Sequence, residues 1–160
     1  MSCDLTTGRV DGGCLDSIGG IKNIYLGNYS AALQDNITLT GEEITAVANS
    51  VTFYKFELRG TNNIDEANTK DINAGTSIFE ASGTITLKKQ DKVTQGQMML
   101  LSKGRPHVIA EGYDGSLRMF GIENGVDVAV NTASGADLNE FNGYTLTLTS
   151  KEKNLAYFVN

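Results

Sequence analysis

The stretch TSIFEASGTITLKK (residues 76–89) decides the fold class, because its side chains alternate between apolar and polar. One face carries Phe79, Ala81, Gly83, Ile85 and Leu87, and the other carries Glu80, Ser82, Thr84, Thr86 and Lys88. Successive side chains of a strand point to opposite faces of its sheet. The alternation therefore predicts a strand with one face in a core and one in water, as antiparallel sheets provide.

A single helix is predicted directly after this strand, over residues 91–104 (DKVTQGQMMLLSKG). Asp91 suits the N-cap, Lys103 lies in the last turn and Gly104 suits the end of the helix. Gly96 within the helix costs about 1 kcal/mol relative to alanine. Apolar contacts with the core are expected from Val93, Met98, Leu100 and Leu101.

Short strands are predicted after the helix, at HVIAEGY, SLRMFGIE, VDVAVNT, YTLTLT and LAYFV. Asp114-Gly115 and Asn124-Gly125 separate the first three, and both dipeptides suit type I′ hairpin turns. Inward-facing sets are expected in two of these strands, with Val126, Val128 and Val130 in one and Tyr144, Leu146 and Leu148 in the other.

Strands are also predicted before the alternating stretch, from Ile21 (IKNIYLGNY), at Ile37–Thr40 and Glu43–Val47 around Gly41, and at residues 51–59 (VTFYKFELR). Residues 60–75 (GTNNIDEANTKDINAG) are polar and lack a sustained period, which favours a long loop. The first 20 residues are rich in glycine and are expected to form an irregular arm.

These elements predict a mainly β fold. About eight to ten antiparallel strands would form two packed sheets, as a sandwich or partly open barrel, with one flanking α-helix. A chain of 160 residues suits one domain. We place that domain at residues 21–160, after the arm at residues 1–20, with a long loop at residues 60–75.

The formal net charge is −6 and the pI is about 4.7, which argues against a protein that grips nucleic acid. No export signal or membrane-spanning stretch is recognisable in the sequence, so folding in a cytosol is expected. Cys3 and Cys14 are then expected to be reduced thiols, with a disulfide within the arm as the alternative.

Chemical motifs give no positive support for an enzyme. His107, the only histidine, follows Pro106 and is interpreted as a strand-end residue. No phosphate loop, dinucleotide fingerprint, nucleophile elbow or compact zinc motif is recognisable. The carboxylates fall in no catalytic frame; they include Glu42, Glu43, Asp65, Glu66, Asp71 and Glu111. The sequence therefore predicts no catalytic, cofactor or metal site.

The order of elements in residues 76–159 is informative. The predicted order begins with a strand, one helix and a hairpin over Asp-Gly. A short hairpin over ENG follows. Ser134-Gly135, Asp137 and the stretch NGYTLTLT come next, and a final aromatic strand ends the region. In this order the region resembles the tail tube proteins of tailed bacteriophages. GGIKNIYLGNY after a cysteine-bearing arm is also similar to tail and neck proteins of such phages. The first half departs more, which keeps a head-to-tail connector (neck) ring protein of the same fold as an alternative.

The resemblance implies homohexameric rings whose subunits each add one sheet to an inner barrel, and which stack into a tube for DNA. It implies a virion protein assembled in the host cytoplasm, with other tail or neck proteins as partners and no membrane. DNA would pass without specific binding, because an acidic lumen repels phosphate. A carbohydrate-binding or adhesin sandwich stays open as another class, which aromatics exposed in a groove would favour. A small enzyme is the third class.

Residues 60–75 carry the one predicted inter-subunit site. A long ordered loop is costly unless something outside the domain orders it, which favours contact with a subunit in the next ring over a mobile surface loop. Polar contacts are expected from Asn62, Asn63, Asp65, Asn68 and Asp71, with Ile64 and Ile72 as small apolar anchors.

The final apolar run, LAYFV, raises a separate question. Proteins usually protect the edge of a sheet with lysine, proline or a bulge, and this run has neither residue. It is therefore either paired within the subunit or left open as a surface through which subunits join.

Overall fold

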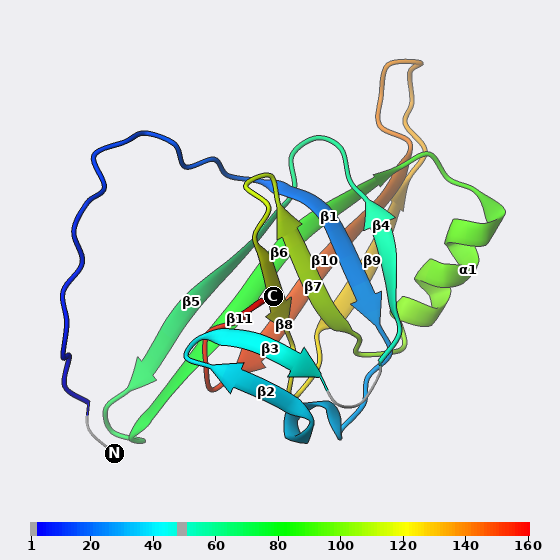
Figure 1. Cartoon of the computed structure of the whole chain (residues 1–160). Coiled ribbons are helices and arrows are strands. Elements are labelled where there is room, and N and C mark those ends of the chain that lie inside the picture. The colour runs from blue at the N-terminus through cyan, green and yellow to red at the C-terminus, as the bar shows by residue number, and fades with distance from the viewer. Residues whose placement is uncertain (1–2, 48–50) are drawn as a thin grey trace.

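The computed structural model describes residues 3–47 and 51–160 and shows two packed β-sheets with one α-helix beside them (Figure 1). The larger sheet contains β1 (Ile21–Gly27), β2 (Ile37–Thr40), β3 (Glu43–Val47), β4 (Phe53–Glu57), β7 (His107–Gly112), β8 (Leu117–Phe120) and β11 (Tyr157–Val159). The smaller sheet contains β5 (Asn63–Asp71), β6 (Thr76–Lys88), β9 (Asp127–Ala133) and β10 (Gly143–Glu152). The helix is α1 (Lys92–Leu101), and η1 (Leu33–Asp35) is one turn of 3-10 helix.

The strand order is β2-β3-β11-β8-β7-β1-β4 in the larger sheet and β5-β6-β10-β9 in the smaller one. Neighbouring strands are antiparallel except β11 and β3, which are parallel. The predicted mainly β fold, with two packed antiparallel sheets and one flanking helix, is confirmed, and the sheets do not close into a barrel.

The main core lies between the two sheets, and the alternation of the strands supplies it. In β6, Ala81 and Ile85 are buried while Ser82 and Thr84 are exposed. The predicted inward sets of β9 and β10 pack there too, since Val126, Val128, Tyr144, Leu146 and Leu148 are all buried. The larger sheet contributes Ile21, Ile24, Leu26, Val108, Ala110 and Phe120. A second, smaller cluster forms where η1 and β3 meet β8, around Leu33, Ile44, Met119 and Ile122.

The last strand of the chain, β11, is paired within the subunit. It lies between β3 and β8, with Phe158 opposite Glu43 on one side and opposite Arg118 on the other. The backbone N–H of Asn160 also donates to the Ile44 carbonyl at 3.1 Å. Of the two explanations for the apolar end of the chain, the structure shows the internal one. β11 is not an open edge.

The long loop expected at residues 60–75 is instead the strand β5 and a tight turn into β6. Nine residues of β5 pair in continuous register with β6, from Asn63 opposite Thr84 to Asp71 opposite Thr76. The prediction failed because β5 is an outermost strand whose far half is exposed on both faces. That half therefore lacks the apolar alternation that marks a half-buried strand.

Two turns differ from their predicted type. A type I′ turn needs positive φ at both central residues, but Gly115 has φ 87° while Asp114 does not have positive φ. The turn closes through Gly115 N–H donating to the Gly112 carbonyl, with Gly112 N–H donating to the Ser116 carbonyl. Asn124-Gly125 is not a hairpin turn, because it connects β8 in the larger sheet to β9 in the smaller sheet.

The predicted helix is present, and its N-cap is confirmed. A carboxylate oxygen of Asp91 accepts from the Thr94 N–H at 2.7 Å, and this hydrogen bond lowers the pKa of Asp91. The apolar contacts are corrected, because only Met98 is buried and Leu101 is half-buried. Val93 and Leu100 are 74% and 76% exposed, so they do not join the core.

Candidate functional site

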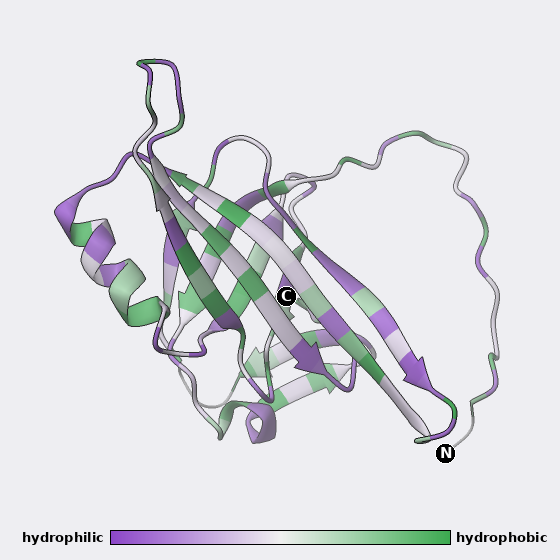
Figure 2. Cartoon of the chain, turned by 180° about the vertical axis from the view of Figure 1, so that it is seen from behind, coloured by the Kyte–Doolittle hydropathy of each residue, from purple (hydrophilic) through white to green (hydrophobic). Residues whose placement is uncertain are grey.

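The β5–β6 hairpin projects beyond the other strands (Figure 1). Its turn is held by Asp71, whose carboxylate accepts from the N–H groups of Asn73 and Ala74 at 3.0 and 3.1 Å. Ile72 lies at the tip and is 95% exposed. Figure 2 shows β5 as largely hydrophilic. The hairpin therefore ends in a single large apolar side chain that is exposed at the end of a polar projection.

The predicted inter-subunit residues divide into two groups. Five of them are exposed along the hairpin, namely Asn63, Asp65, Asn68, Asp71 and Ile72. Asn62 and Ile64 turn inward instead: Asn62 is 3% exposed and accepts from the Thr86 N–H at 2.8 Å, and Ile64 packs against the main core. Both side chains therefore pack within the subunit's own fold, and contact of the predicted residues with a neighbour stays a prediction.

Several of the exposed polar side chains are already engaged within the hairpin. The Asn68 amide donates to Ser77 Oγ at 3.0 Å and to the Ile78 carbonyl at 3.1 Å. The Asn63 amide donates to Asp65 Oδ2 at 2.7 Å. The hairpin is thus ordered by its own ladder and side chains, which removes the argument that a neighbour must order it. Contact with the next ring stays a prediction, and Ile72 is its best-placed residue.

An ion pair between Glu66 and Arg118 joins the two sheets at the base of the hairpin. Arg118 Nη2 on β8 donates to Glu66 Oε1 on β5, and Glu66 Oε2 accepts from the Ala156 N–H at 2.9 Å. The Glu66 side chain is only 7% exposed, compared with 34% for Arg118. Glu66 is two residues from Ile64 and therefore shares the inward face of β5 with it, which is the one signal in the sequence that could have indicated this role.

We expect Arg118→Leu to lower the free energy of unfolding by about 2–3 kcal/mol, because it leaves the Glu66 carboxylate buried without its cation. This loss in the free energy of unfolding is smaller than for a fully buried ion pair, because the Arg118 side chain is partly exposed. Adding Glu66→Gln should restore about 1 kcal/mol, since the neutral amide still accepts from the Ala156 N–H. Urea unfolding of the two variants measures both values; a double variant no more stable than Arg118→Leu would contradict the role of the buried charge.

A cavity of about 160 Å³ lies beside this pair, and its carboxylates are all engaged. Glu152 accepts from the N–H groups of Glu123 and Asn124 at 3.2 and 3.1 Å, and its burial raises the pKa of the carboxyl group. Glu123 pairs with Lys153 at 3.1 Å.

Glu111, on β7, does not line this cavity. Its carboxylate accepts from the Asn23 amide at 2.9 Å, and that hydrogen bond lowers the pKa of Glu111. Each of these carboxylates therefore has a hydrogen-bond or ion-pair partner, and these contacts hold loops and strands in place.

His107 has a structural environment at the start of β7, as its predicted strand-end position indicates. It is fully buried, with Nε2 accepting from the Ser30 N–H at 3.0 Å and Nδ1 lying 2.7 Å from the Gly121 carbonyl oxygen. That carbonyl can only accept, which assigns the proton to Nδ1. The ring packs 5.2 Å from the Tyr29 ring. Both nitrogens of His107 are therefore committed to the fold.

The central part of the outward face of the smaller sheet carries small polar and acidic side chains, between Lys88 at one end of β6 and the exposed Lys151–Glu80 ion pair toward the other. Thr147 on β10 stands between Thr84 on β6 and Ala129 on β9, and all three are exposed. The next row joins Asp65, Ser82, Thr149 and Asp127 across all four strands. These seven side chains are two aspartates, four hydroxyl-bearing residues and one alanine, and they form a surface that we call the threonine face. Its hydroxyl groups suit contact with water.

The edges of the sheets are β5 and β9 in the smaller sheet and β2 and β4 in the larger one. β9 (DVAVNTA) contains no lysine, arginine or proline, which are the residues that usually protect an edge. β9 is thus an outermost strand that lacks these residues, whereas β11, the strand that the sequence left as a possible open edge, is paired on both sides. α1 lies close to β9 without hydrogen-bonding to it as a strand would.

The described part of the predicted arm, residues 3–20, has no helix or strand, and each of its residues is exposed. Residues 1 and 2 of the predicted arm lie outside the described residues. Cys3 and Cys14 are both exposed free cysteines, without a disulfide between them. The arm leaves the fold at Gly20, whose φ of 94° turns the chain away from β1.

Within the described residues, no cluster of three or more histidine, cysteine or carboxylate side chains could hold a metal ion. No helix in the same ranges has both the length and the apolarity that a membrane crossing requires. In comparisons with known proteins, the chain matches no family model, no curated protein and no solved structure.

Proposed function

We propose that this chain is a structural virion protein, a ring-forming subunit whose rings stack into the tail tube of a bacteriophage. Six copies would form a ring, and DNA would pass through its lumen without specific binding. The protein would assemble in the host cytoplasm together with other tail or neck proteins. This function follows from the resemblance of residues 76–159 to tail tube proteins and requires a surface that can line a DNA conduit.

The threonine face is the observation that carries the proposal. It combines Asp65 and Asp127 with the hydroxyl groups of Ser82, Thr84, Thr147 and Thr149. Hydroxyl groups keep a wall hydrated, and carboxylates repel the phosphates of DNA. A wall of lysine and arginine would instead release counterions from DNA and hold it. A face of this composition lets DNA slide.

Three further features support assembly into rings and stacks. β9 is an outermost strand without lysine, arginine or proline, the β5–β6 hairpin ends in the exposed Ile72, and the arm carries large exposed apolar side chains. Each is costly to leave in water for a protein that acts as a monomer. Copies of the same chain would cover them.

The assembly state tests the proposal directly. We expect the purified chain to form rings of six subunits, and tubes at higher concentration, in negative-stain microscopy and mass photometry. Burial of sheet edges and apolar side chains between copies drives this association. Only monomers across a wide concentration range, including in crowding agents, would refute the proposal.

The charge of the threonine face gives a second test. Replacing Asp65 and Asp127 by lysine should leave rings intact and make them retain duplex DNA, with retention that falls steeply as salt rises. The matched control replaces Glu42 and Glu43 by lysine, which changes the net charge equally at the exposed β2–β3 turn. Filter binding at several salt concentrations measures retention. Equal DNA retention by both variants would contradict the assignment of the threonine face to the lumen.

Two alternatives make different predictions in the same experiments. A neck ring protein of the same fold would form rings that do not stack. A carbohydrate-binding sandwich would stay monomeric, and a groove lined by Tyr29, Tyr54 and Phe56 is the observation that favours it. Of these rings, Tyr54 is 57% exposed, whereas Tyr29 packs against His107 with the Arg105 guanidinium 4.0 Å above it.

A further inference from the structure

A groove of about 540 Å³ lies between the C-terminal half of α1, the end of β1 and the edge strand β4. Its apolar lining comes from Leu26, Tyr54, Phe56, Leu100 and Leu101. Leu100 and Tyr54 are 76% and 57% exposed. Binding sites in proteins are mostly apolar concavities of roughly 300–1,000 Å³. The groove is therefore large enough for several side chains of a partner.

The apolar surface continues from the groove onto α1. Val93 is 74% exposed and Met99 is 55% exposed, while Met98 is the one α1 residue that is buried. A surface helix usually turns its apolar stripe toward the core. This helix leaves most of its apolar side chains in water, so its outer face lacks a partner within the described part of the chain.

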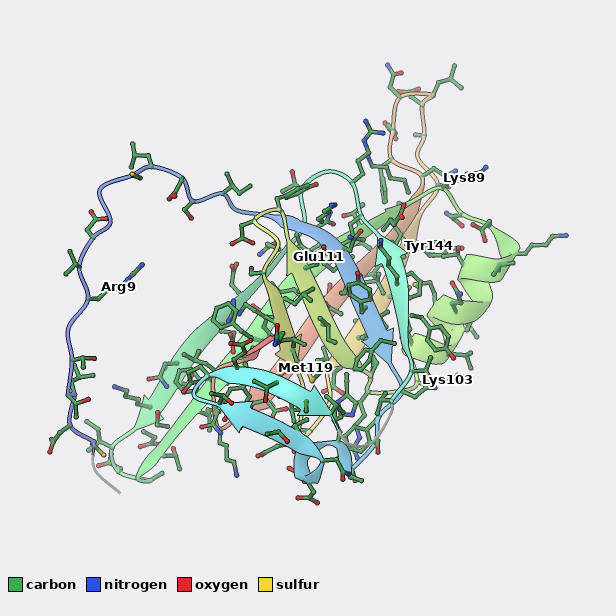
Figure 3. All side chains as sticks on the ribbon, viewed as in Figure 1. Arg9, Lys89, Lys103, Glu111, Met119 and Tyr144 are labelled. Atoms are coloured by element: carbon green, nitrogen blue, oxygen red, sulfur yellow. The ribbon has the colours of Figure 1, made fainter. Side chains whose placement is uncertain are left out.

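Positive charge surrounds this apolar surface in a chain whose net charge is −6. Residues 88–105 hold one acidic residue, Asp91, and five basic ones, namely Lys88, Lys89, Lys92, Lys103 and Arg105. Figure 3 places Lys89 and Lys103 toward the two ends of α1. Among the described residues that line the groove none is acidic, and Arg105 is basic. A segment that fits this groove would therefore carry both apolar and acidic side chains.

The N-terminal arm of the same chain has this composition. Leu5, Val10, Leu15 and Ile18 are 94%, 89%, 106% and 57% exposed. The arm also contains three aspartates and one arginine within residues 3–20. No other described segment of this length is exposed at every residue.

We propose that the groove between α1 and β4 receives the arm of a second copy of this chain. Leu15 and Ile18 are the apolar anchors, and Asp16 between them lies toward Arg105 and Lys103. β4 is the outermost strand of its sheet, so its outer N–H and C=O groups suit an extended occupant such as the arm. The arm runs along the side of the molecule opposite α1 (Figures 1 and 2), which favours the groove of another copy over its own.

The occupant's identity rests on the proposed self-assembly, and disulfide trapping tests it. Cys3 and Cys14 are the chain's only cysteines, and Cys14 adjoins Leu15. The donor carries Cys3→Ser and keeps Cys14. The acceptor lacks both native cysteines and carries Gln97→Cys in the groove. The two chains, distinguished by a size tag, are mixed and mildly oxidised. We expect at least about tenfold more disulfide-linked heterodimer than with an acceptor carrying Thr147→Cys on the threonine face.

The anchor is tested with a matched pair of donors. Leu15→Asp should lower the heterodimer yield about tenfold or more, because it removes a buried leucine from the complex. Ser17→Asp adds the same charge to the arm without removing an apolar side chain, and should leave the yield unchanged.

Three results would overturn the inference. These are equal trapping at Gln97→Cys and Thr147→Cys, equal effects of the two donor substitutions, or a bridge that forms only within one chain carrying both Cys14 and Gln97→Cys. Microscopy of the same preparations separates the two proposals. Rings without selective trapping would refute the arm contact alone, whereas selective dimers without rings would refute the ring-forming function alone.

Discussion

Shortening the β5–β6 hairpin should abolish the stacking of rings while leaving each subunit folded. The change replaces residues 69–78 by Asn-Gly, which joins Asn68 to Phe79, its partner in the ladder. It removes the exposed Ile72 and keeps Ile64 and Glu66, which pack or pair within the subunit. The free energy of unfolding should fall by only about 1–2 kcal/mol, because the three ladder pairs that are lost lie in the projecting half of the hairpin, away from the main core. Microscopy measures tube length, and thermal unfolding checks the fold.

A matched pair of point variants tests the contribution of the apolar side chain at the tip of the hairpin to stacking. Ile72→Asp should shorten or prevent tubes, because it places a charge where an apolar contact is expected. Asn73→Asp adds the same charge one residue away, at a side chain whose loss removes no apolar contact, and tubes should persist. Tubes of normal length from the shortened hairpin would show that the projection has no part in stacking.

Gly83→Val should prevent the subunit from folding, with a loss of about 3 kcal/mol or more in the free energy of unfolding. Gly83 lies in the centre of β6, where β5 passes closely. A Cβ atom there would collide with the Asn63 carbonyl oxygen and would lie 2.8 Å from the Ile64 Cα. Both obstacles are backbone, so no side-chain rotation can relieve them. Yield of folded protein and circular dichroism measure the effect.

Gly96→Ala is the matched control for the loss of a glycine. Gly96 lies inside α1, and a Cβ atom added there would meet nothing within 4 Å. Alanine should therefore raise the free energy of unfolding by about 0.5–1 kcal/mol through its helix propensity. If Gly83→Val unfolded no more readily than the parent, the close approach of β5 to β6 would be refuted.

The fold was predictable wherever burial imposes a period on the sequence. Ala81, Ile85, Leu146 and Leu148 alternate with polar residues because one face of β6 and β10 packs against the other sheet. The N-cap of α1 was equally predictable, because the Asp91 side chain accepts a hydrogen bond from a backbone N–H only three residues away. Both signals are local in the chain, so they can be recognised without knowledge of the tertiary structure.

The rest of the fold depended on contacts that no local pattern encodes. β5 is polar on both faces where it projects, so its pairing with β6 left no period in the sequence. β11 lies between β3 and β8 through pairings that are distant in the sequence, since Phe158 lies opposite both Glu43 and Arg118. Of the predicted inter-subunit residues, Ile72 is exposed at the tip of the hairpin, whereas the inward position of Asn62 depends on the register of β5 and β6.

The central position of β11 governs when the larger sheet can form during synthesis. β2 and β3 leave the ribosome early, yet they join the rest of the sheet only through Tyr157, Phe158 and Val159. Until those residues emerge, one edge of β3 and one edge of β8 have no neighbour, and the nascent chain exposes strands that could pair wrongly. The larger sheet therefore becomes continuous only after residues 157–159 have been made and have left the ribosome.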